Sequence, residues 1–322
     1  MSAELPTIVE KSRSSHWTLW PRFLTFPVGV VVGHAAMVAH WGGESGWAMT
    51  AWLAFTTICW ICVAGSYHEA AHFTLSRNTA VDLWYGRVVG TIIFSPISLF
   101  REVHRRHHAY LNSADDWELW PYGDPQKSRR FRRMFVWLDI VFAIVVTPAV
   151  YSRIYFVRSS RLPENVRRTI RNEYLGVLAF WSGVAAFVIV TFDAGVIEWQ
   201  NFEPIWLLPP ALAASCNSLR KLTEHLGYPT GDPMLGTRTI LAINPITRLF
   251  VYFDFDLAVH GPHHRFPKLD HARLRDAFDE LQKENADKYP LFNGYLSAFF
   301  DTLPWIVSNP AVGENVSNSA AP

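Results

Sequence analysis

The chain has 322 residues, a formal net charge of +1 and a hydrophobic content of 50%. This length can bury a sizeable core in one or two domains, and the near-neutral charge gives no reason to propose nucleic acid or another polyanion as a partner. Three cysteines are too few for a disulfide scaffold. Cys59 and Cys62 have thioredoxin-like spacing, but they lie inside an apolar run, so we interpret both as buried helical residues.

The distribution of apolar residues indicates an integral membrane protein. Residues 1–20 are polar and charged, and we expect them to form a soluble tail with no cleavable signal peptide. Four later stretches approach the roughly 20 residues that a helix needs to cross a bilayer. They are 23–40, 47–66, 174–192 and the shorter, proline-containing 204–219.

A fifth apolar run, 134–152, is also long enough to cross but carries Asp139. The segments on either side of it, 77–133 and 153–171, are both rich in arginine, and such segments tend to stay on the cytoplasmic side. If both are cytoplasmic, the fifth run lies along the membrane interface or enters and returns on the same side.

These patterns predict an all-α membrane protein with a single domain over 1–322, four transmembrane helices and additional interfacial helices. A cytoplasmic helical cap would be formed by 67–133, 217–245 and 248–304. Residues 306–322 are rich in Ser, Asn, Ala and Pro, and we expect them to be a disordered tail.

Histidines at helical spacing follow the second apolar run. His68 and His72 lie four residues apart, so a helix that continues out of the bilayer presents both on one face. His104, His107 and His108 have the spacing i, i+3 and i+4, which again indicates a single helical face. We expect both sets to lie in the cap.

A third cluster reads His260-Gly-Pro-His263-His264. Because proline is tolerated in the first turn of a helix, a helix is expected to begin near His260 and to let His263 and His264 share a face. A ninth histidine, His225, lies in a charged segment on the same predicted side. Imidazole suits iron, zinc, copper or nickel, and nine nitrogens are too many for one ion and about right for two.

Two other interpretations use the same residues. His68-Glu69-x-x-His72 matches the zinc metalloprotease motif, with Glu69 as general base, but a zinc protease needs only three protein ligands and leaves the other clusters unexplained. A membrane metal transporter would carry its histidines along a path through the spans, and only His34 and His40 lie inside a predicted span.

In this order and spacing, the clusters resemble the histidine boxes of the membrane fatty acid desaturase superfamily, over roughly 65–267. The flanking sequences His68-Glu-Ala-Ala-His-Phe-Thr-Leu and His263-His-Arg-Phe-Pro267 also look like family sequence. The resemblance implies two non-haem irons held by histidine nitrogens. It assigns the ligand role to His68, His72, His104, His107, His108, His225, His260, His263 and His264.

Polar side chains near the clusters are candidates for orienting the ligand imidazoles. The candidates are Glu69, Asp115, Asp116, Asn217, Glu224 and Asp270. Asp115 and Asp116 are preferred because they follow the second cluster closely, whereas Glu224 can also form an ion pair with Arg220. Some relatives have an asparagine four residues before the additional histidine; this chain has Lys221 there, and Asn217 lies one further turn back.

The resemblance implies an oxidoreductase that uses O2 and two external electrons to abstract hydrogen from an unactivated C–H bond of a lipid. Fatty acyl desaturation is the expected outcome, and hydroxylation or ketolation within the same superfamily is the alternative. The sequence has no haem, flavin or iron–sulfur motif, so the expected electron donor is ferredoxin, or cytochrome b5 with its reductase. The expected location is the bacterial inner membrane or the endoplasmic reticulum, with the metal site on the cytoplasmic side.

A basic segment that contains Arg129, Arg130, Arg132 and Arg133 could serve one of two roles. It could receive an acidic electron carrier, or it could anchor the protein on anionic lipid.

Overall fold

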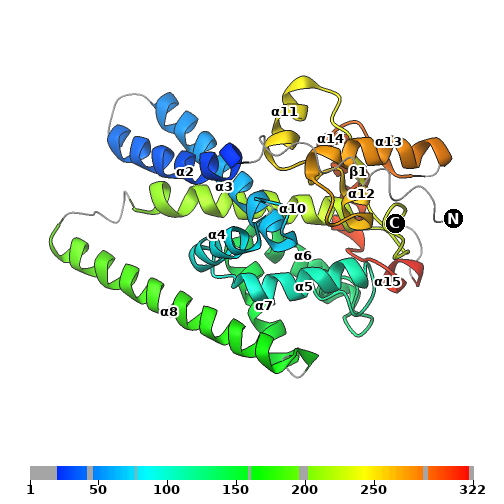
Figure 1. Cartoon of the computed structure of the whole chain (residues 1–322), viewed down its shortest axis with the longest axis horizontal. Helices are drawn as coiled ribbons and strands as arrows, with labels where there is room; N and C mark the ends of the chain where they lie inside the picture. Colours follow the sequence, from blue (N-terminus) through cyan, green and yellow to red (C-terminus); the bar gives the residue numbers. More distant parts are fainter. Residues whose placement is uncertain are drawn as a thin grey trace.

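The computed structural model describes residues 20–41, 46–76, 78–158, 161–195, 202–285 and 289–318. Helices dominate this part of the chain (Figure 1). The strands within it are two short ones, β1 (Thr239–Ile240) and β2 (Leu291–Phe292), which pair in parallel. The all-α prediction is therefore correct apart from this small parallel pair. Most of the predicted soluble tail lies outside the described residues.

Three helices are long and apolar enough to cross a membrane: α2 (Trp20–His40), α3 (Gly46–His72) and α8 (Glu164–Asp193). Helices α2 and α3 lie side by side at one end of the molecule (Figure 1). Gly29 and Gly33 permit this close approach, because a methyl group at Gly29 would lie 2.6 Å from Cys59 Sγ and one at Gly33 would overlap Thr56. Small residues four apart are typical of close membrane helix pairs.

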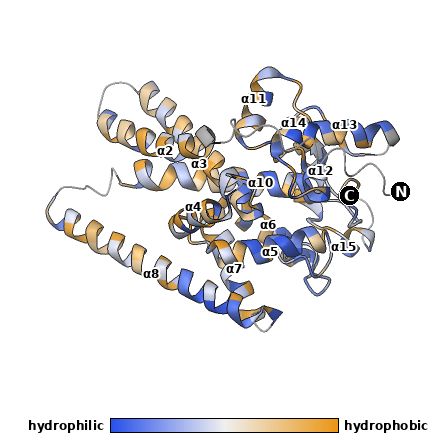
Figure 2. Cartoon of the chain, viewed as in Figure 1, coloured by the Kyte–Doolittle hydropathy of each residue, from blue (hydrophilic) through white to orange (hydrophobic). Residues whose placement is uncertain are grey.

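Helix α8 stands apart from the other helices at its C-terminal end (Figure 1). Its first turns are hydrophilic and the rest is largely apolar (Figure 2), and Leu178, Phe187 and Val190 are each 65% exposed. A contiguous apolar surface of this kind is costly in water. It suits a helix surrounded by lipid.

Two helix pairs are sharply bent. Helices α4 (Thr79–Ile92) and α5 (Ile97–Ala109) meet at 102°, and α6 (Arg129–Val141) and α7 (Ala143–Arg158) meet at 120°. The predicted fifth run, 134–152, is thus not one straight helix but is broken at Phe142. The described residues contain three candidate spans, or up to five if each bent pair is counted as one.

The predicted fourth span, 204–219, is also interrupted. It consists of a π-helical segment, η3 (Glu203–Leu207), followed by α10 (Leu208–His225), and it is not among the three candidate spans found in the described residues. Prolines within the run lack the N–H that a regular helix requires. His34 of α2 donates its Nδ1–H to the carbonyl of Ile205 at 2.8 Å, which provides a buried partner for this irregular backbone.

The remaining elements gather toward the end of the molecule where α10 ends (Figure 1). They are α11 (Pro245–Phe253), α12 (His260–Arg265), η4 (His271–Arg273), α13 (Leu274–Glu284), α14 (Tyr295–Ser308) and α15 (Glu314–Ser317).

The C-terminal segment is ordered where we expected disorder. Ile306, Ala311 and Val312 are at most 1% exposed, and Arg132 donates hydrogen bonds to the carbonyl of Pro310 and to the side chain of Asn309. The prediction of a disordered end over 306–322 is therefore wrong for 306–318. Composition misled the prediction because a few apolar side chains, Ile306 and Val312 among them, pack into the core, and Arg132 binds the backbone between them. Residues 319–322 lie outside the described part.

Candidate metal centre

The structure gathers all nine predicted histidines into two adjacent groups. Cluster 1 contains His68, His72, His104, His108 and His263, and cluster 2 contains His107, His225, His260 and His264. Within each cluster, one nitrogen from every ring lies within 4.8 Å of those of the others. The clusters adjoin, since the ring centroids of His108 and His264 are 4.3 Å apart.

Two helices supply histidines to both clusters. On α5, His104 and His108 point into cluster 1 while His107 points into cluster 2. On α12, His263 points into cluster 1 and its neighbour His264 into cluster 2. The expectation that the latter two share a face is wrong, because consecutive residues on a helix of 3.6 residues per turn point about 100° apart.

The nitrogen positions match ligands around an ion. His104 Nε2 lies 3.0 Å from Nε2 of both His72 and His108, and His260 Nε2 lies 2.8 Å from His225 Nε2. Two imidazole ligands at right angles, each about 2.1 Å from one metal, would be about 3.0 Å apart. His104 Nδ1 lies against a carboxylate, so Nε2 is the nitrogen that faces the cluster.

Carboxylates lie behind the inward-facing rings. Glu118 accepts from His104 Nδ1 at 2.7 Å, and Asp116 accepts from His107 Nδ1 at 2.8 Å. His260 Nδ1 lies 3.1 Å from the carbonyl of Leu257 and 3.5 Å from Glu224. Metal-ligating histidines commonly donate their second N–H to such acceptors, which fixes ring orientation and increases ligand basicity.

The predicted orienting residues thus meet different outcomes. Asp116 and Glu224 contact cluster histidines as expected. Asp115 does not have the expected role, because it lies at the surface and forms ion pairs with Arg106 and Arg161. Sequence reasoning missed Glu118, which belongs to the same loop; its signal was a third acidic residue only two positions beyond Asp116.

Two further candidates, Glu69 and Asp270, have other surroundings. Glu69 accepts from Thr74 Oγ1 at 2.7 Å and lies 3.3 Å from His68 Nδ1. Asp270 is buried and caps the short helix η4 by accepting from the amide of Ala272. These contacts give Glu69 a place behind a cluster 1 histidine and give Asp270 a structural role.

Lys221 occupies the position where some relatives have asparagine. Its ammonium lies 3.0 Å from the buried carboxylate of Asp139, which also accepts from Ser218 and Tyr122. Asn217, one turn earlier, has a buried Oδ1 without a hydrogen-bond partner. The lysine therefore fastens α10 to α6 close to cluster 2.

Burial sets the charge of the site. Desolvation and neighbouring imidazoles hold the pKa values of His225, His260, His263 and His264 well below the ordinary 6.5. Neutral imidazole is the form that binds metal. Although burial opposes ionisation of Glu118, the adjacent His104 holds the pKa of that carboxyl well below its usual range.

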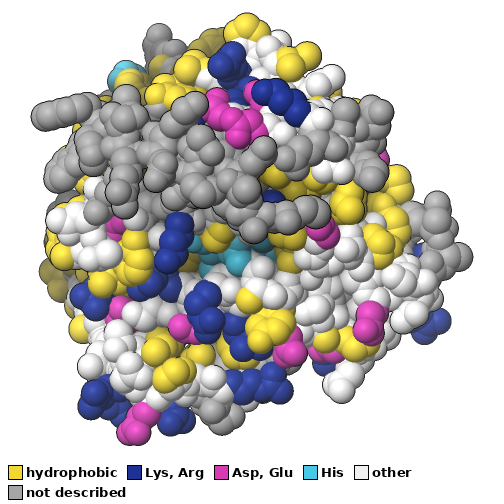
Figure 3. Space-filling model, turned by 45° about the vertical axis from the view of Figure 1, so that its right-hand side comes forward, with side chains coloured by type: hydrophobic (Ala, Val, Ile, Leu, Met, Phe, Trp, Pro, Cys, Tyr) yellow, Lys and Arg dark blue, Asp and Glu magenta, His cyan; other side chains and the backbone are white. Residues whose placement is uncertain are grey.

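An open cavity of about 420 Å³ leads to cluster 1. His72, His104 and His108 line its inner end, and Arg101, Arg105 and Lys268 lie among the residues around it. Figure 3 shows histidine side chains at the bottom of a hollow with basic side chains around it. The cluster is therefore accessible from this face in the part of the chain that the structure describes.

Comparisons with known proteins agree with this arrangement. Residues 45–295 match the family model described as fatty acid desaturase. The chain is 23% identical over 301 residues to an sn-1 acyl-lipid omega-3 desaturase (ferredoxin) of Synechocystis sp., covering 85% of this chain and 79% of that protein.

It is also 24% identical over 258 residues to a chloroplastic omega-6 fatty acid desaturase of Spinacia oleracea, and 24% identical over 271 residues to that of Arabidopsis thaliana. Each match covers 76% of this chain and 54% of the plant protein, so the chain spans about half the length of these relatives. Since the family model matches well over half of the chain and includes all three histidine clusters, the chain belongs to the fatty acid desaturase family.

Proposed function

We propose that this chain is a membrane di-iron oxidoreductase that uses O2 and two external electrons to desaturate a fatty acyl chain. The observation that carries the proposal is the convergence of nine imidazoles into two adjoining clusters, with carboxylates or a carbonyl behind several of them. One zinc ion with three protein ligands would leave most of these residues without a role.

The residues fit two irons, one in each cluster. Bound there, the irons would supply the oxidising power, drawn from O2, that removes hydrogen from an unactivated C–H bond. Glu118 holds the ring of His104 in position by accepting from its Nδ1–H, and Asp116 does the same for His107. Burial and neighbouring imidazoles keep His225, His260, His263 and His264 in the neutral form that binds metal.

Electrons must come from a partner, and we propose ferredoxin or cytochrome b5 with its reductase. The basic surroundings of the cavity beside cluster 1, with Arg101, Arg105 and Lys268, suit an acidic carrier. In the basic segment suggested by the sequence, Arg132 is 5% exposed and engaged in internal hydrogen bonds, whereas Arg129, Arg130 and Arg133 are exposed and could serve the same role. The metal site would then face the cytoplasm, as expected from the basic segments.

Metal analysis of single variants tests the proposal. Purified protein expressed with added iron should contain about two irons per chain. Replacing His72 with alanine should remove iron from cluster 1, and His225→Ala should remove it from cluster 2, so that each variant retains about one. The exposed His40, which bonds only within its own helix, provides the control variant His40→Ala.

A single zinc per chain, lost in His72→Ala and retained in His225→Ala, would contradict the di-iron proposal and support the protease interpretation. Lipid profiling then identifies the reaction. A new double bond indicates desaturation, a new hydroxyl or keto group indicates the alternative reactions that begin with the same hydrogen abstraction, and unchanged lipids with transported metal indicate a transporter.

A further inference from the structure

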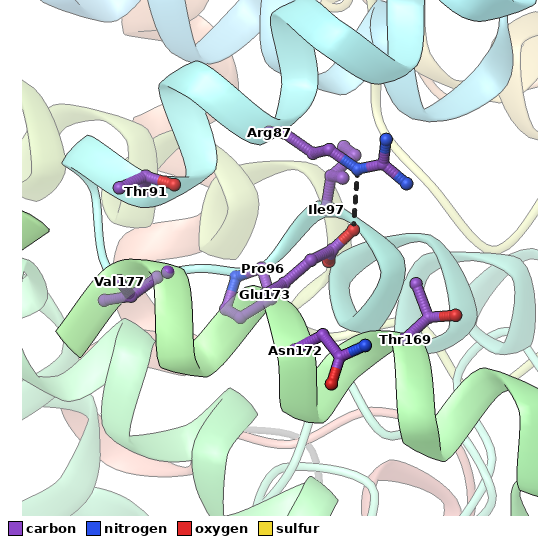
Figure 4. A pocket seen from close by; sticks show the side chains of 9 residues that line it. Arg87, Thr91, Pro96, Ile97, Thr169, Asn172, Glu173 and Val177 are labelled. Carbon is purple, nitrogen blue, oxygen red and sulfur yellow. Dashed lines mark hydrogen bonds and ion pairs between the residues drawn. The ribbon is translucent and has the colours of Figure 1, made fainter. Parts of the chain in front are cut away.

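A groove of about 470 Å³ runs between α4 and the polar end of α8, beside the start of α5. Figure 4 shows Arg87 extending from α4 and Glu173 extending from α8 toward each other, with Ile97 behind them. The groove lies where α8 changes from hydrophilic to apolar along its length (Figure 2). It therefore faces the boundary between the polar surface and the hydrocarbon of a bilayer.

One end of the groove is polar and is lined by the ion pair of Arg87 and Glu173. Arg87 Nε lies 3.2 Å from Glu173 Oε1, and the arginine side chain is 53% exposed, so its amino groups face the groove and its surroundings. Glu173 also accepts from the amide and hydroxyl of Ser98 at 3.0 and 2.8 Å. Glu173 is held by these bonds, and the ion pair uses only Nε of Arg87, so the remaining amino groups of Arg87 are the part of the groove that can receive an anion.

The other end is apolar and firmly held. Ile97 and Val177 line it, and Gly176 leaves its floor open, since a methyl group there would meet nothing within 4 Å. Trp181 Nε1 donates to the carbonyl of Thr91 at 2.9 Å, which ties α8 to α4 at this end. Hydrogen bonds thus hold α8 against α5 at one end and against α4 at the other, so the groove has a defined shape.

The groove adjoins the cavity that leads to cluster 1. Thr169 lines both, and Ile97 of the groove is followed on α5 by Ser98 of the cavity. His104 lies seven residues beyond Ile97, or about 10 Å along the helix at 1.5 Å per residue. A molecule in the groove therefore lies about two helical turns from His104 and next to the cavity that reaches it.

We propose that this groove binds a membrane phospholipid, with its phosphate at Arg87 and the start of an acyl chain along Gly176 and Val177. The inference rests on the proposed function in one respect: the bound lipid is the form in which the enzyme receives its acyl substrate. A guanidinium can bind a phosphate through two parallel hydrogen bonds. The groove is polar at one end and apolar at the other, as a phospholipid is at the bilayer surface.

Gly176 provides a direct test, with Gly183 as its matched control. Both glycines lie on α8, seven residues apart and hence on nearly the same face, and a methyl group at either one meets nothing within 4 Å. Leucine forms helix better than glycine, so both Gly176→Leu and Gly183→Leu should fold. Only the former fills the groove.

The probe is phosphatidylglycerol in nanodiscs, with product measured by gas chromatography and retained lipid counted by native mass spectrometry. We expect Gly176→Leu to retain fewer lipid molecules and to lose at least tenfold in turnover, with Arg87→Gln reduced in the same direction and Gly183→Leu like the wild type. If the two leucine variants retained equal amounts of lipid and had equal turnover, the groove would not be the lipid-binding site. If the wild type forms no product but Gly176→Leu still loses lipid, the proposed reaction fails and the binding site stands.

Discussion

At the scale of single residues, the orientation of each imidazole depends on the group behind it. Glu118, whose side chain is 13% exposed, accepts from His104 Nδ1 at 2.7 Å. We expect Glu118→Gln to weaken iron binding at cluster 1 by roughly 10- to 100-fold, because a weaker acceptor lowers the basicity of the ring and loosens its position. Iron retained per chain during dialysis against a chelator measures the effect.

Two variants separate this effect from general damage. Asp116→Asn should instead weaken iron binding at cluster 2, because Asp116 accepts a hydrogen bond from His107 Nδ1. Glu102→Gln removes a carboxylate that pairs with the exposed Arg105 and should leave iron retention unchanged. If Glu118→Gln retained iron as tightly as Glu102→Gln, the role assigned to Glu118 would be wrong.

At the scale of elements, Arg132 joins α6 to the C-terminal segment. Its guanidinium donates to the carbonyls of Pro310 and Lys127 and to the side chain of Asn309. We expect Arg132→Ala to lower the free energy of unfolding by about 2–4 kcal/mol, because it leaves several buried acceptors without a donor. Limited proteolysis of this variant should then cleave within 309–318. A variant with Arg130→Ala, at an exposed position nearby, should stay uncleaved in that segment.

Local patterns predicted the elements that carry histidines, and long-range contacts decided the rest. The i, i+4 spacing correctly placed His68 and His72 at the end of α3 and placed His104 and His108 on one helix. It could not show that His107 turns to a second cluster, because that depends on where α10 and α12 pack against α5. Similarly, three acidic residues follow one another in the loop after α5, and only folding distinguishes the exposed Asp115 from Asp116 and Glu118.

At the scale of the whole molecule, so many buried neutral imidazoles link the stability of the metal-free protein to pH. In the folded chain the pKa values of His225, His260, His263 and His264 lie well below 6.5, and in the unfolded chain they return to about 6.5. Below that pH the unfolded state binds more protons than the folded state. Stability is therefore fully present above pH 6.5 and is lost as the pH falls.

Two buried carboxyls act in the opposite direction. Burial raises the pKa of Glu224 to about 8 and that of Asp254 to about 6, so each favours the folded state at low pH. Each histidine contributes about 1 kcal/mol of destabilisation between pH 7.5 and 5.5, and four histidines outweigh two carboxyls. We expect the thermal midpoint of iron-free protein in detergent to fall over this range, and to fall less in protein loaded with iron, whose ligands are not free to take protons. A midpoint that rose as the pH fell would contradict this prediction, because the carboxyls would then outweigh the histidines.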